Sequence, residues 1–353
     1  MWPDRRILDL LGIEHPIVQA PMAGSQASAL TIAVSEAGGL GSLPCALLSR
    51  EQMRTELQII RQRTGKPFNV NFFCHTPPAA DAAREAKWLE RLAPYRQELG
   101  VTQATVNAGR APFNEETCAL VEEFRPRVVS FHFGLPHKSL LGRVKAAGSV
   151  VIASATTVAE ARWLEDHGVD AVIAQGAEAG GHRGTFLSED IASQPGTFAL
   201  VPQVVDAVRV PVIAAGGIGD ARGIVAAMAL GAAAVQIGTA YLLTPESTIS
   251  PIYRAALKTA REDQTVLTNV FTGRPARGLV NRAIRELGPM SSEAPAFPNA
   301  TNATLPLRMK AEAAGSGEFT SLWSGQAPRF AREMPAGELT QGLAADALKR
   351  WVR

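Results

Sequence analysis

The chain alternates short apolar runs rich in β-branched residues with longer stretches of helical periodicity between residues 17 and 243. This alternation predicts a parallel sheet whose strands are joined by crossover helices. Two of the runs, Val150–Ala153 and Pro211–Ala215, contain no polar residue in alternation. Strands of that kind are expected where other structure covers both faces of a sheet. The sequence therefore predicts an α/β protein with a buried parallel sheet.

We predict eight strands, which is the number that closes a (β/α)8 TIM barrel. They are expected at Ile17–Met22, Leu40–Leu43, Phe68–Phe73, Val128–Phe133, Ser149–Ala155, Asp170–Gln175, Val210–Ala215 and Ala233–Gly238. Helical patterns lie between them at 49–64, 114–124, 158–167 and 220–230. Ser49 and Gln52 have the spacing of a capping box, so a helix is expected to begin there.

The alternation stops after Leu243, which predicts a second unit. We expect a barrel at 1–243, a smaller and mostly helical subdomain at 244–322, and at 323–353 a final helix that returns to the barrel. Residues 288–306 contain four prolines. Because proline breaks both helices and strands, we expect this segment to be an extended crossing loop.

Composition excludes several classes of protein. The 35 basic and 33 acidic residues give a formal charge of +2 without a basic block, so no nucleic-acid partner is expected. The three cysteines form no CxxC pair, which favours a reducing compartment and argues against a structural metal. Every apolar window is shorter than the ~20 residues of a membrane span. We expect a soluble cytoplasmic protein, a monomer or a homodimer, that binds no membrane.

Glycines follow the seventh and eighth predicted strands, as Gly216-Gly217 and Gly238-Thr239. A phosphate needs converging backbone N–H groups with no Cβ in the way, preferably at a helix amino terminus such as the one expected at Asp220. In barrels these two loops are the usual phosphate site. Either the glycines bind a phosphate or they only allow tight turns. No GxGxxG follows an early strand, which argues against a Rossmann site.

Two side-chain amides, Asn71 and Gln175, lie near the ends of otherwise apolar strands. A buried amide must find hydrogen-bond partners, either in a ligand or in neighbouring backbone. We expect Asn69 to point to the opposite face of its strand from Asn71, which makes Asn71 the better candidate for contact with a ligand.

Two histidines are candidates for chemistry. His182 follows the sixth strand among four glycines, in a loop that can fold closely over a ligand while it presents one side chain. His132 ends the fourth strand, where it is either a second substrate-facing imidazole or a core histidine with satisfied hydrogen bonds.

The order of motifs resembles the nitronate monooxygenase family, formerly called 2-nitropropane dioxygenase, and its bacterial and fungal class I enzymes above all. The motifs are Gln19-Ala-Pro-Met-Ala-Gly24, Ala37-Gly-Gly-Leu-Gly41, Gly176-Ala-Glu-Ala-Gly-Gly-His-Arg-Gly184, Ala214-Ala-Gly-Gly-Ile218 and Gln236-Ile-Gly-Thr239. The likeness runs from the first strand to about Leu243, and Trp323-Ser-Gly-Gln326 is also similar to the family pattern.

The resemblance implies an FMN enzyme that oxidises alkyl nitronates, such as propionate 3-nitronate, with O2 to a carbonyl compound and nitrite. It implies His182 as the catalytic residue and His132 as a residue that lines the substrate site. The positions that match FMN-binding positions are Pro21, Met22, Ala23, Asn71 (less so Asn69), Gln175, Gly180, Gly217, Gln236, Ile237, Gly238 and Thr239. The tyrosines and lysine that close the family pocket have no counterpart in Pro295–Arg308, which leaves substrate preference open.

Three alternatives share much of this pattern. One is an FMN-dependent NAD(P)H reductase for enoyl thioesters or quinones on the same barrel. A second is a nucleotide dehydrogenase without flavin, which needs a cysteine nucleophile after the sixth strand, where this chain has none. The third is a non-catalytic protein that binds a phosphorylated ligand, which leaves the His182 loop without a role.

Overall fold

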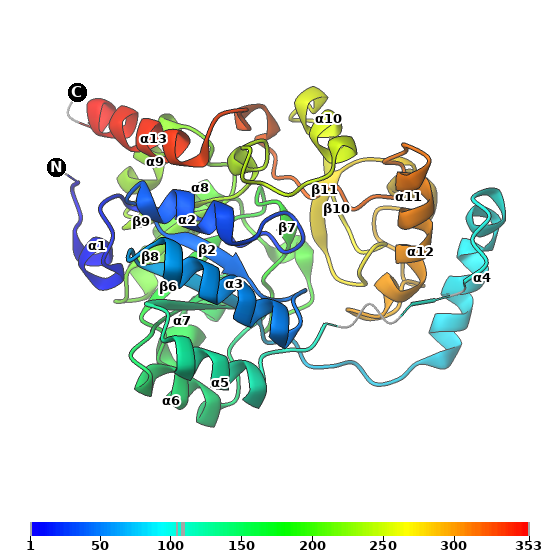
Figure 1. Ribbon diagram of the computed structural model, residues 1–353, viewed down its shortest axis with the longest axis horizontal. Helices are drawn as coiled ribbons and strands as arrows, with labels where there is room; N and C mark the ends of the chain where they lie inside the picture. The colour runs from blue at the N-terminus through cyan, green and yellow to red at the C-terminus, as the bar shows by residue number, and fades with distance from the viewer. Residues whose placement is uncertain (1, 104, 107–109, 352–353) are drawn as a thin grey trace.

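A computed structural model describes residues 2–103, 105–106 and 110–351. Eight parallel strands pair in the order β1-β9-β8-β6-β5-β4-β3-β2, and a parallel bridge between Val18 and Leu40 joins the two ends of this sheet. The sheet therefore closes on itself, and helices surround it (Figure 1). The predicted TIM barrel is confirmed.

All eight predicted barrel strands are present, with differences only at their ends. Two of these differences have the same cause, since Pro21 and Pro211 lack an N–H to continue the ladder. The barrel strands are β1 (Ile17–Gln19), β2 (Gly41–Pro44), β3 (Phe68–Phe73), β4 (Val128–His132), β5 (Val150–Ala155), β6 (Ala171–Gln175), β8 (Val212–Ala215) and β9 (Ala234–Ile237).

Nine helices of the described chain lie around the barrel. They are α1 (Arg6–Leu11), α2 (Ser28–Glu36), α3 (Arg50–Arg63), α5 (Glu115–Phe124), α6 (Lys138–Ala146), α7 (Val158–Asp166), α8 (Thr197–Ala207), α9 (Ala221–Ala229) and α13 (Ala336–Trp351). The predicted capping box begins α3: Ser49 Oγ accepts from Gln52 N at 3.2 Å, and Gln52 Oε1 accepts from Ser49 N at 2.8 Å.

The barrel core lies on both faces of its strands. Val151, Ile152, Val172 and Ile213 are completely buried, as the unbroken apolar runs predict. The last helix, α13, packs against α9 and α2, and Figure 1 shows it beside the barrel wall near the amino terminus. Among the described residues, no helix combines the length and the apolar character needed to cross a membrane.

A second group of elements lies at the open end of the barrel and is called the appended region here. It consists of α4 (Ala82–Glu98), α10 (Pro251–Thr259), α11 (Arg282–Leu287), α12 (Ala300–Ala313), β10 (Thr265–Thr268) and β11 (Ala276–Leu279). β11 pairs antiparallel with β10 and with β7 (Gly181–His182), a short strand of the loop after β6. Short 3₁₀ turns occur at Ile191–Ser193, Thr239–Tyr241 and Pro328–Phe330.

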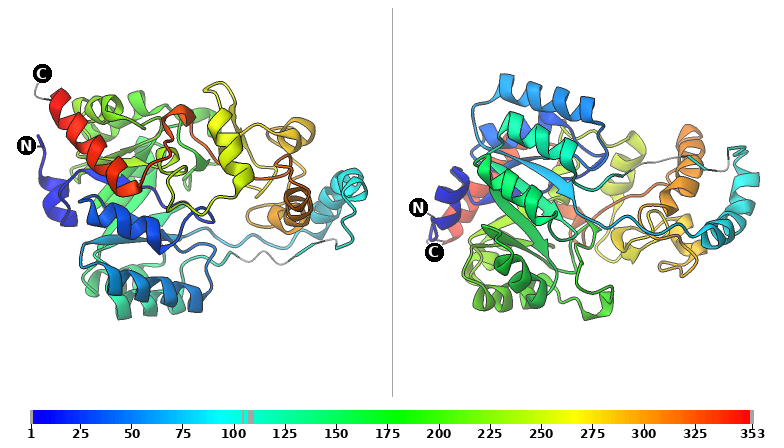
Figure 2. Two further views of the ribbon diagram at one scale, coloured as in Figure 1. Left: turned by 45° about the horizontal axis from the view of Figure 1, so that its top comes forward. Right: turned by 90° about the horizontal axis from the view of Figure 1, so that it is seen from below.

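The appended region has a core of its own, to which α4 contributes. After β3 the chain leaves the barrel, forms α4 beside α12, and returns as α5, as both views in Figure 2 show. Trp88 and Leu92 of α4 are fully buried in the cluster that includes Leu307 and Phe319. The predicted division of the chain into units at 243 and 322 stays a prediction. Although α4 belongs by sequence to the predicted barrel unit 1–243, it packs against α12 of the predicted subdomain 244–322.

The prediction of an extended loop at 288–306 is wrong for its last part. The helix α12 begins at Ala300 and contains Pro306 in its interior. Proline removes one helical hydrogen bond, to the carbonyl four residues earlier. That carbonyl, Asn302 O, instead accepts from Val106 N at 2.9 Å, so a neighbouring segment satisfies the group that Pro306 leaves free.

Candidate active site

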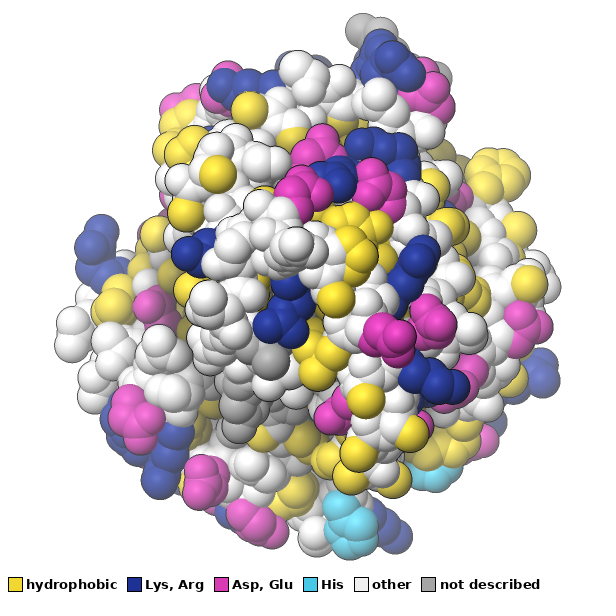
Figure 3. Space-filling model, turned by 90° about the vertical axis from the view of Figure 1, so that its right-hand side faces the viewer, with side chains coloured by type: hydrophobic (Ala, Val, Ile, Leu, Met, Phe, Trp, Pro, Cys, Tyr) yellow, Lys and Arg dark blue, Asp and Glu magenta, His cyan; other side chains and the backbone are white. Residues whose placement is uncertain are grey.

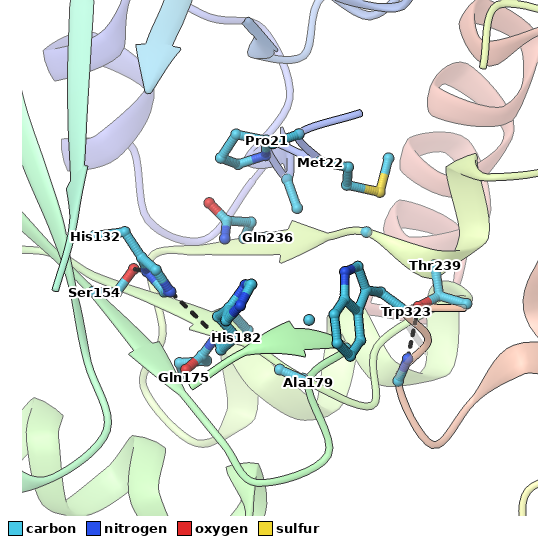
Figure 4. Close-up of a pocket in the computed structure, with 18 of the residues that line it drawn as sticks. Pro21, Met22, His132, Ser154, Gln175, Ala179, His182, Gln236, Thr239 and Trp323 are labelled. Atoms are coloured by element: carbon cyan, nitrogen blue, oxygen red, sulfur yellow. Dashed lines mark hydrogen bonds between the residues drawn. The ribbon is translucent and has the colours of Figure 1, made fainter. Parts of the chain in front are cut away.

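A pocket opens at the carboxyl ends of the barrel strands, and Figure 4 shows the side chains that converge on it. Most of the predicted site residues line it: Pro21, Met22, Ala23, Asn71, His132, Gln175, Gly180, His182, Gly217, Gln236, Gly238 and Thr239. Asn69 and Ile237 are completely buried behind the pocket wall. The sequence thus located the pocket through the residues at strand ends.

Glycine is required at the turn that follows β8. Gly216 and Gly217 have φ values of +118° and +70°, which other residues rarely adopt. A Cβ on Gly216 would also lie 2.7 Å from Thr197 Oγ1. The hydroxyl of Thr197 donates to the Gly216 carbonyl at 3.0 Å, so this turn is held from outside the pocket.

The N–H groups at the amino terminus of the helix that follows this turn already have a hydrogen-bond acceptor in the helix cap. Asp220 caps α9, and its Oδ1 accepts from Arg222 N at 2.9 Å and from Gly223 N at 3.2 Å. The first-turn N–H groups that would otherwise attract an anion therefore already have a carboxylate. A phosphate at this corner would depend on the glycine turns rather than on the helix terminus that the sequence suggested.

Two distant segments meet closely at Gly180. A Cβ on Gly180 would lie 2.5 Å from Gly325 N and 2.6 Å from Ser324 C, so only glycine fits there. Gly325 N donates to Thr239 Oγ1 at 3.0 Å. The segment that begins at Trp323 therefore closes the side of the pocket beside the turns after β6 and β9 (Figure 4).

The two predicted amides have protein partners. Both polar atoms of the Gln175 side chain hold the loop that follows β6: Nε2 donates to His182 O at 3.0 Å, and Oε1 accepts from Gly184 N at 2.8 Å. Asn71 Nδ2 donates to Ser130 Oγ at 2.9 Å. For Gln175 the structure favours the alternative in which the amide satisfies neighbouring backbone.

The expectation that Asn69 and Asn71 point to opposite faces is wrong. Asn69 Nδ2 also donates to Ser130 Oγ, at 2.9 Å, so both amides lie on the same side of β3. Residues two apart share a face of a strand, because side chains alternate with a period of two. Asn69 misses the pocket because it lies one layer deeper in the barrel, not because it points away.

His182 is placed by pairing between the barrel loop and the appended region. Its strand β7 pairs with β11, where His182 lies opposite Ala276. His182 Nε2 lies 2.9 Å from Thr272 Oγ1. The imidazole is surrounded by aromatic rings, with centroids at 5.3 Å for Phe297 and 5.5 Å for Trp323.

These surroundings keep the His182 imidazole neutral. Burial lowers its pKa well below the usual value of 6.5, and the positive charges of Arg110 and Arg274 lower it further. A histidine with a lowered pKa stays unprotonated at neutral pH. His182 can therefore accept a proton there, or donate one hydrogen bond from its single N–H.

His132 supports the backbone of His182. Its Nε2 lies 3.2 Å from His182 O, and its Nδ1 lies 3.0 Å from Ser154 Oγ. A carbonyl only accepts, so Nε2 carries the proton and the Ser154 hydroxyl donates to Nδ1. Burial lowers the pKa of His132 to about 3, and the charge of Arg274 acts in the same direction. His132 lines the pocket with both ring nitrogens already engaged.

The pocket also contains residues that the sequence analysis did not identify. Ser130 precedes His132 by two in β4, so its place on the same face could have been found from the strand period. Arg110 and Tyr253 carried no such signal, because tertiary packing brings them to the barrel mouth, as it brings Thr272 to the His182 imidazole. Within the described residues, no group of three or more His, Cys, Asp or Glu side chains is arranged to hold a metal.

Known proteins are similar to this chain over nearly its whole length. A family model described as nitronate monooxygenase matches residues 4–346. Nitronate monooxygenase from Pseudomonas aeruginosa is 45% identical over 345 residues, 97% of this chain and 98% of that protein. Nitroalkane oxidase from Streptomyces ansochromogenes has a similar structure, with a TM-score of 0.90, 41% identity and coverage of 97% and 98%. FabK from Thermotoga maritima is 31% identical, with a TM-score of 0.75 and coverage of 99% and 97%.

Proposed function

This chain belongs to the nitronate monooxygenase family, an oxidoreductase family, and from that premise we propose that it uses FMN and O2 to oxidise alkyl nitronates. The products would be a carbonyl compound and nitrite, with propionate 3-nitronate as one example of a substrate. The observation that carries the proposal is a single pocket that combines glycine turns after β8 and β9 with a neutral histidine, His182.

The residues of the pocket fit FMN. Gln236 Oε1 is buried, and no hydrogen-bond donor among the described residues reaches it. An N–H of a bound ligand would satisfy it, and the pyrimidine ring of a flavin carries such an N–H. Gly217, Gly238 and Thr239 line the end of the pocket where a phosphate would be held by backbone N–H groups. Pro21, Met22 and Ala23 would cover the flavin from the end of β1.

When bound, FMN supplies the ring that accepts electrons from the substrate and passes them to O2. A nitronate is already a carbanion equivalent, so its oxidation needs no base. The protein then binds the anion, orients it and excludes water, and the aromatic rings around His182 serve this purpose.

A neutral nitroalkane must first lose a proton, and His182 is the group that would accept it. Its Nδ1 has no hydrogen-bond partner among the described residues, while Nε2 lies beside Thr272 Oγ1. If Nε2 donates to Thr272, whose own hydroxyl reaches Arg274 O at 3.3 Å, Nδ1 keeps its lone pair free to accept a proton. General-base catalysis of this kind contributes about 10²–10⁴-fold.

The test is a visible spectrum of the purified protein followed by an oxygen-consumption assay with propionate 3-nitronate and with ethylnitronate. We expect flavin absorbance and O2 uptake that is matched by nitrite release. A colourless protein would contradict the flavin assignment. Rapid anaerobic bleaching of the flavin by NADH, without nitronate-dependent O2 uptake, would instead favour the reductase alternative.

A further inference from the structure

Arg110 is the single charged side chain that lines the pocket in the described part of the chain. Among the described residues no carboxylate pairs with Arg110 or acts on its charge, and its Nε is buried without a hydrogen-bond partner. Its guanidinium carbon lies 5.6 Å from the centroid of the Phe297 ring. Burial lowers the pKa of Arg110 to about 10, which still leaves it charged at neutral pH.

Two partly exposed arginines elsewhere in the chain have carboxylate partners. Arg143 pairs with Glu115 and Glu122, and Arg282 pairs with Glu98 and Glu286. On the face that Figure 3 shows, basic and acidic side chains are likewise mixed. A buried charge without a counter-ion is costly, so an unpaired guanidinium that faces a cavity indicates that an anion binds there.

Arg110 and His182 mark two different places in the pocket. Both lie beside the same aromatic ring, since the Phe297 centroid is 5.3 Å from that of His182 and 5.6 Å from Arg110 Cζ. No hydrogen bond joins the guanidinium to the imidazole in the described residues. Because both groups line one pocket and lie beside Phe297, a substrate whose reacting carbon lies beside His182 can present a second group to Arg110.

We propose that Arg110 is a specificity-determining residue, which binds the carboxylate at the far end of a nitronate that carries one. This inference rests on the proposed function. The planar guanidinium can hold a carboxylate through two parallel hydrogen bonds. Because the opposing pocket walls carry no acidic side chain in the described chain, nothing repels a substrate with two negative charges.

The experiment compares kcat/KM of the FMN-loaded enzyme for propionate 3-nitronate and for ethylnitronate in wild type, Arg110→Gln and Arg110→Lys. A hydrogen bond to a charged group contributes ~1.5–3 kcal/mol, so Arg110→Gln should lower kcat/KM for propionate 3-nitronate by about 10–150-fold through KM. Ethylnitronate should change by less than about threefold. Arg110→Lys should recover part of the preference, because it keeps the charge.

Arg285→Gln is the control for loss of one positive charge, because Arg285 is exposed and paired with Glu318 outside the pocket. Arg285→Gln should leave kcat/KM unchanged for both substrates. Equal losses for both substrates in Arg110→Gln would overturn the inference, and so would loss of bound FMN, which would show that Arg110 holds the cofactor. In wild type, propionate should inhibit ethylnitronate oxidation competitively, and absence of inhibition would also contradict the inference. If neither nitronate is oxidised, the proposed function itself fails.

Discussion

The barrel and the appended region contribute to one pocket in different ways. The barrel supplies residues in the order of its strands, such as Asn71 of β3, Gln175 of β6 and Gln236 of β9. The appended region and the segments that lead to it supply Tyr253 to the pocket wall, and Thr272 and Phe297 as neighbours of the His182 imidazole; their places depend on packing between distant parts of the chain.

His182 lies where the two regions join. Its main chain is held by barrel side chains, because Gln175 and His132 both reach His182 O. Its imidazole is held by the appended region through Thr272 and Phe297. The barrel thus fixes the backbone of the histidine, whereas the appended region surrounds its imidazole. We propose that the barrel likewise fixes where FMN would lie, and that the appended region would tune the imidazole and the choice of substrate.

The first prediction tests the barrel side of the comparison and has the broadest expected effect, because every activity of the protein would depend on bound FMN. In Gly180→Val the new side chain collides with the backbone of Ser324 and Gly325, so the closing segment must move. We expect bound FMN to fall by at least about tenfold, which corresponds to ~1.4 kcal/mol. Flavin absorbance per mole of protein measures this, with Gly142→Ala as the control, since nothing lies within 4 Å of a Cβ at Gly142. Full flavin content in Gly180→Val would argue against a cofactor site there.

The second prediction concerns the residue shared by both regions. His182→Asn should lower kcat/KM for neutral nitroalkanes by about 10²–10⁴-fold and affect preformed nitronates less. Because the pKa of His182 is lowered, the wild-type rate with nitroalkanes should stay constant as the pH falls through 6.5, and decline only at more acidic pH. Equal losses for both substrate types would remove the assignment of His182 as a base.

The third prediction separates the supporting role of His132 from substrate binding. Its pKa is about 3 in the folded chain against an ordinary value of 6.5, so the unfolded chain binds its proton first as the pH falls. The free energy of unfolding should therefore decrease below pH 6.5, and His132 should account for about 2 kcal/mol of that decrease at pH 5. Urea unfolding at pH 7 and pH 5 measures it. His132→Gln should lose that part of the pH dependence, and an unchanged dependence would show that His132 is not buried in its neutral form.

The smallest effect is expected from the appended region's contact with the imidazole. Thr272→Val removes the hydroxyl that lies 2.9 Å from His182 Nε2. A hydrogen bond of this kind contributes ~0.5–1.5 kcal/mol, so kcat/KM for nitroalkanes should fall by about 2–12-fold while flavin content stays the same. Thr272→Ser keeps the hydroxyl and should retain most of the activity. A loss of flavin in Thr272→Val would mean that the appended region also contributes to FMN binding, which would contradict the division of roles between the two regions.

The sequence predicted the barrel well because its strands are local patterns. Apolar runs such as Val150–Ala153 and the glycines at 216 and 217 signal their structure within a few residues. The two-residue period of a strand also places Asn69 and Asn71 on one face. The expectation that they point to opposite faces was therefore a wrong use of that period.

Other parts of the site could not be predicted from local pattern. The pairing of β7 with β11 joins residues about ninety positions apart, and α4 packs against a helix more than two hundred residues later. Pro306 was expected in a loop because proline breaks helices. The hydrogen bond that lets the helix continue, from Val106 N to Asn302 O, depends on tertiary structure and leaves no local pattern in the sequence. Arg110 belongs to no recognisable sequence motif. Only the structure shows that it lines the pocket and has no carboxylate partner among the described residues.

A crystal structure of the protein with FMN bound tests the central claim most directly. We predict that the cofactor phosphate lies at the backbone of Gly217 and Gly238-Thr239, that an N–H of the flavin ring lies within hydrogen-bond distance of Gln236 Oε1, and that the ring faces the imidazole of His182. A flavin ring outside this pocket, or a pocket that stays empty at saturating FMN, would contradict it.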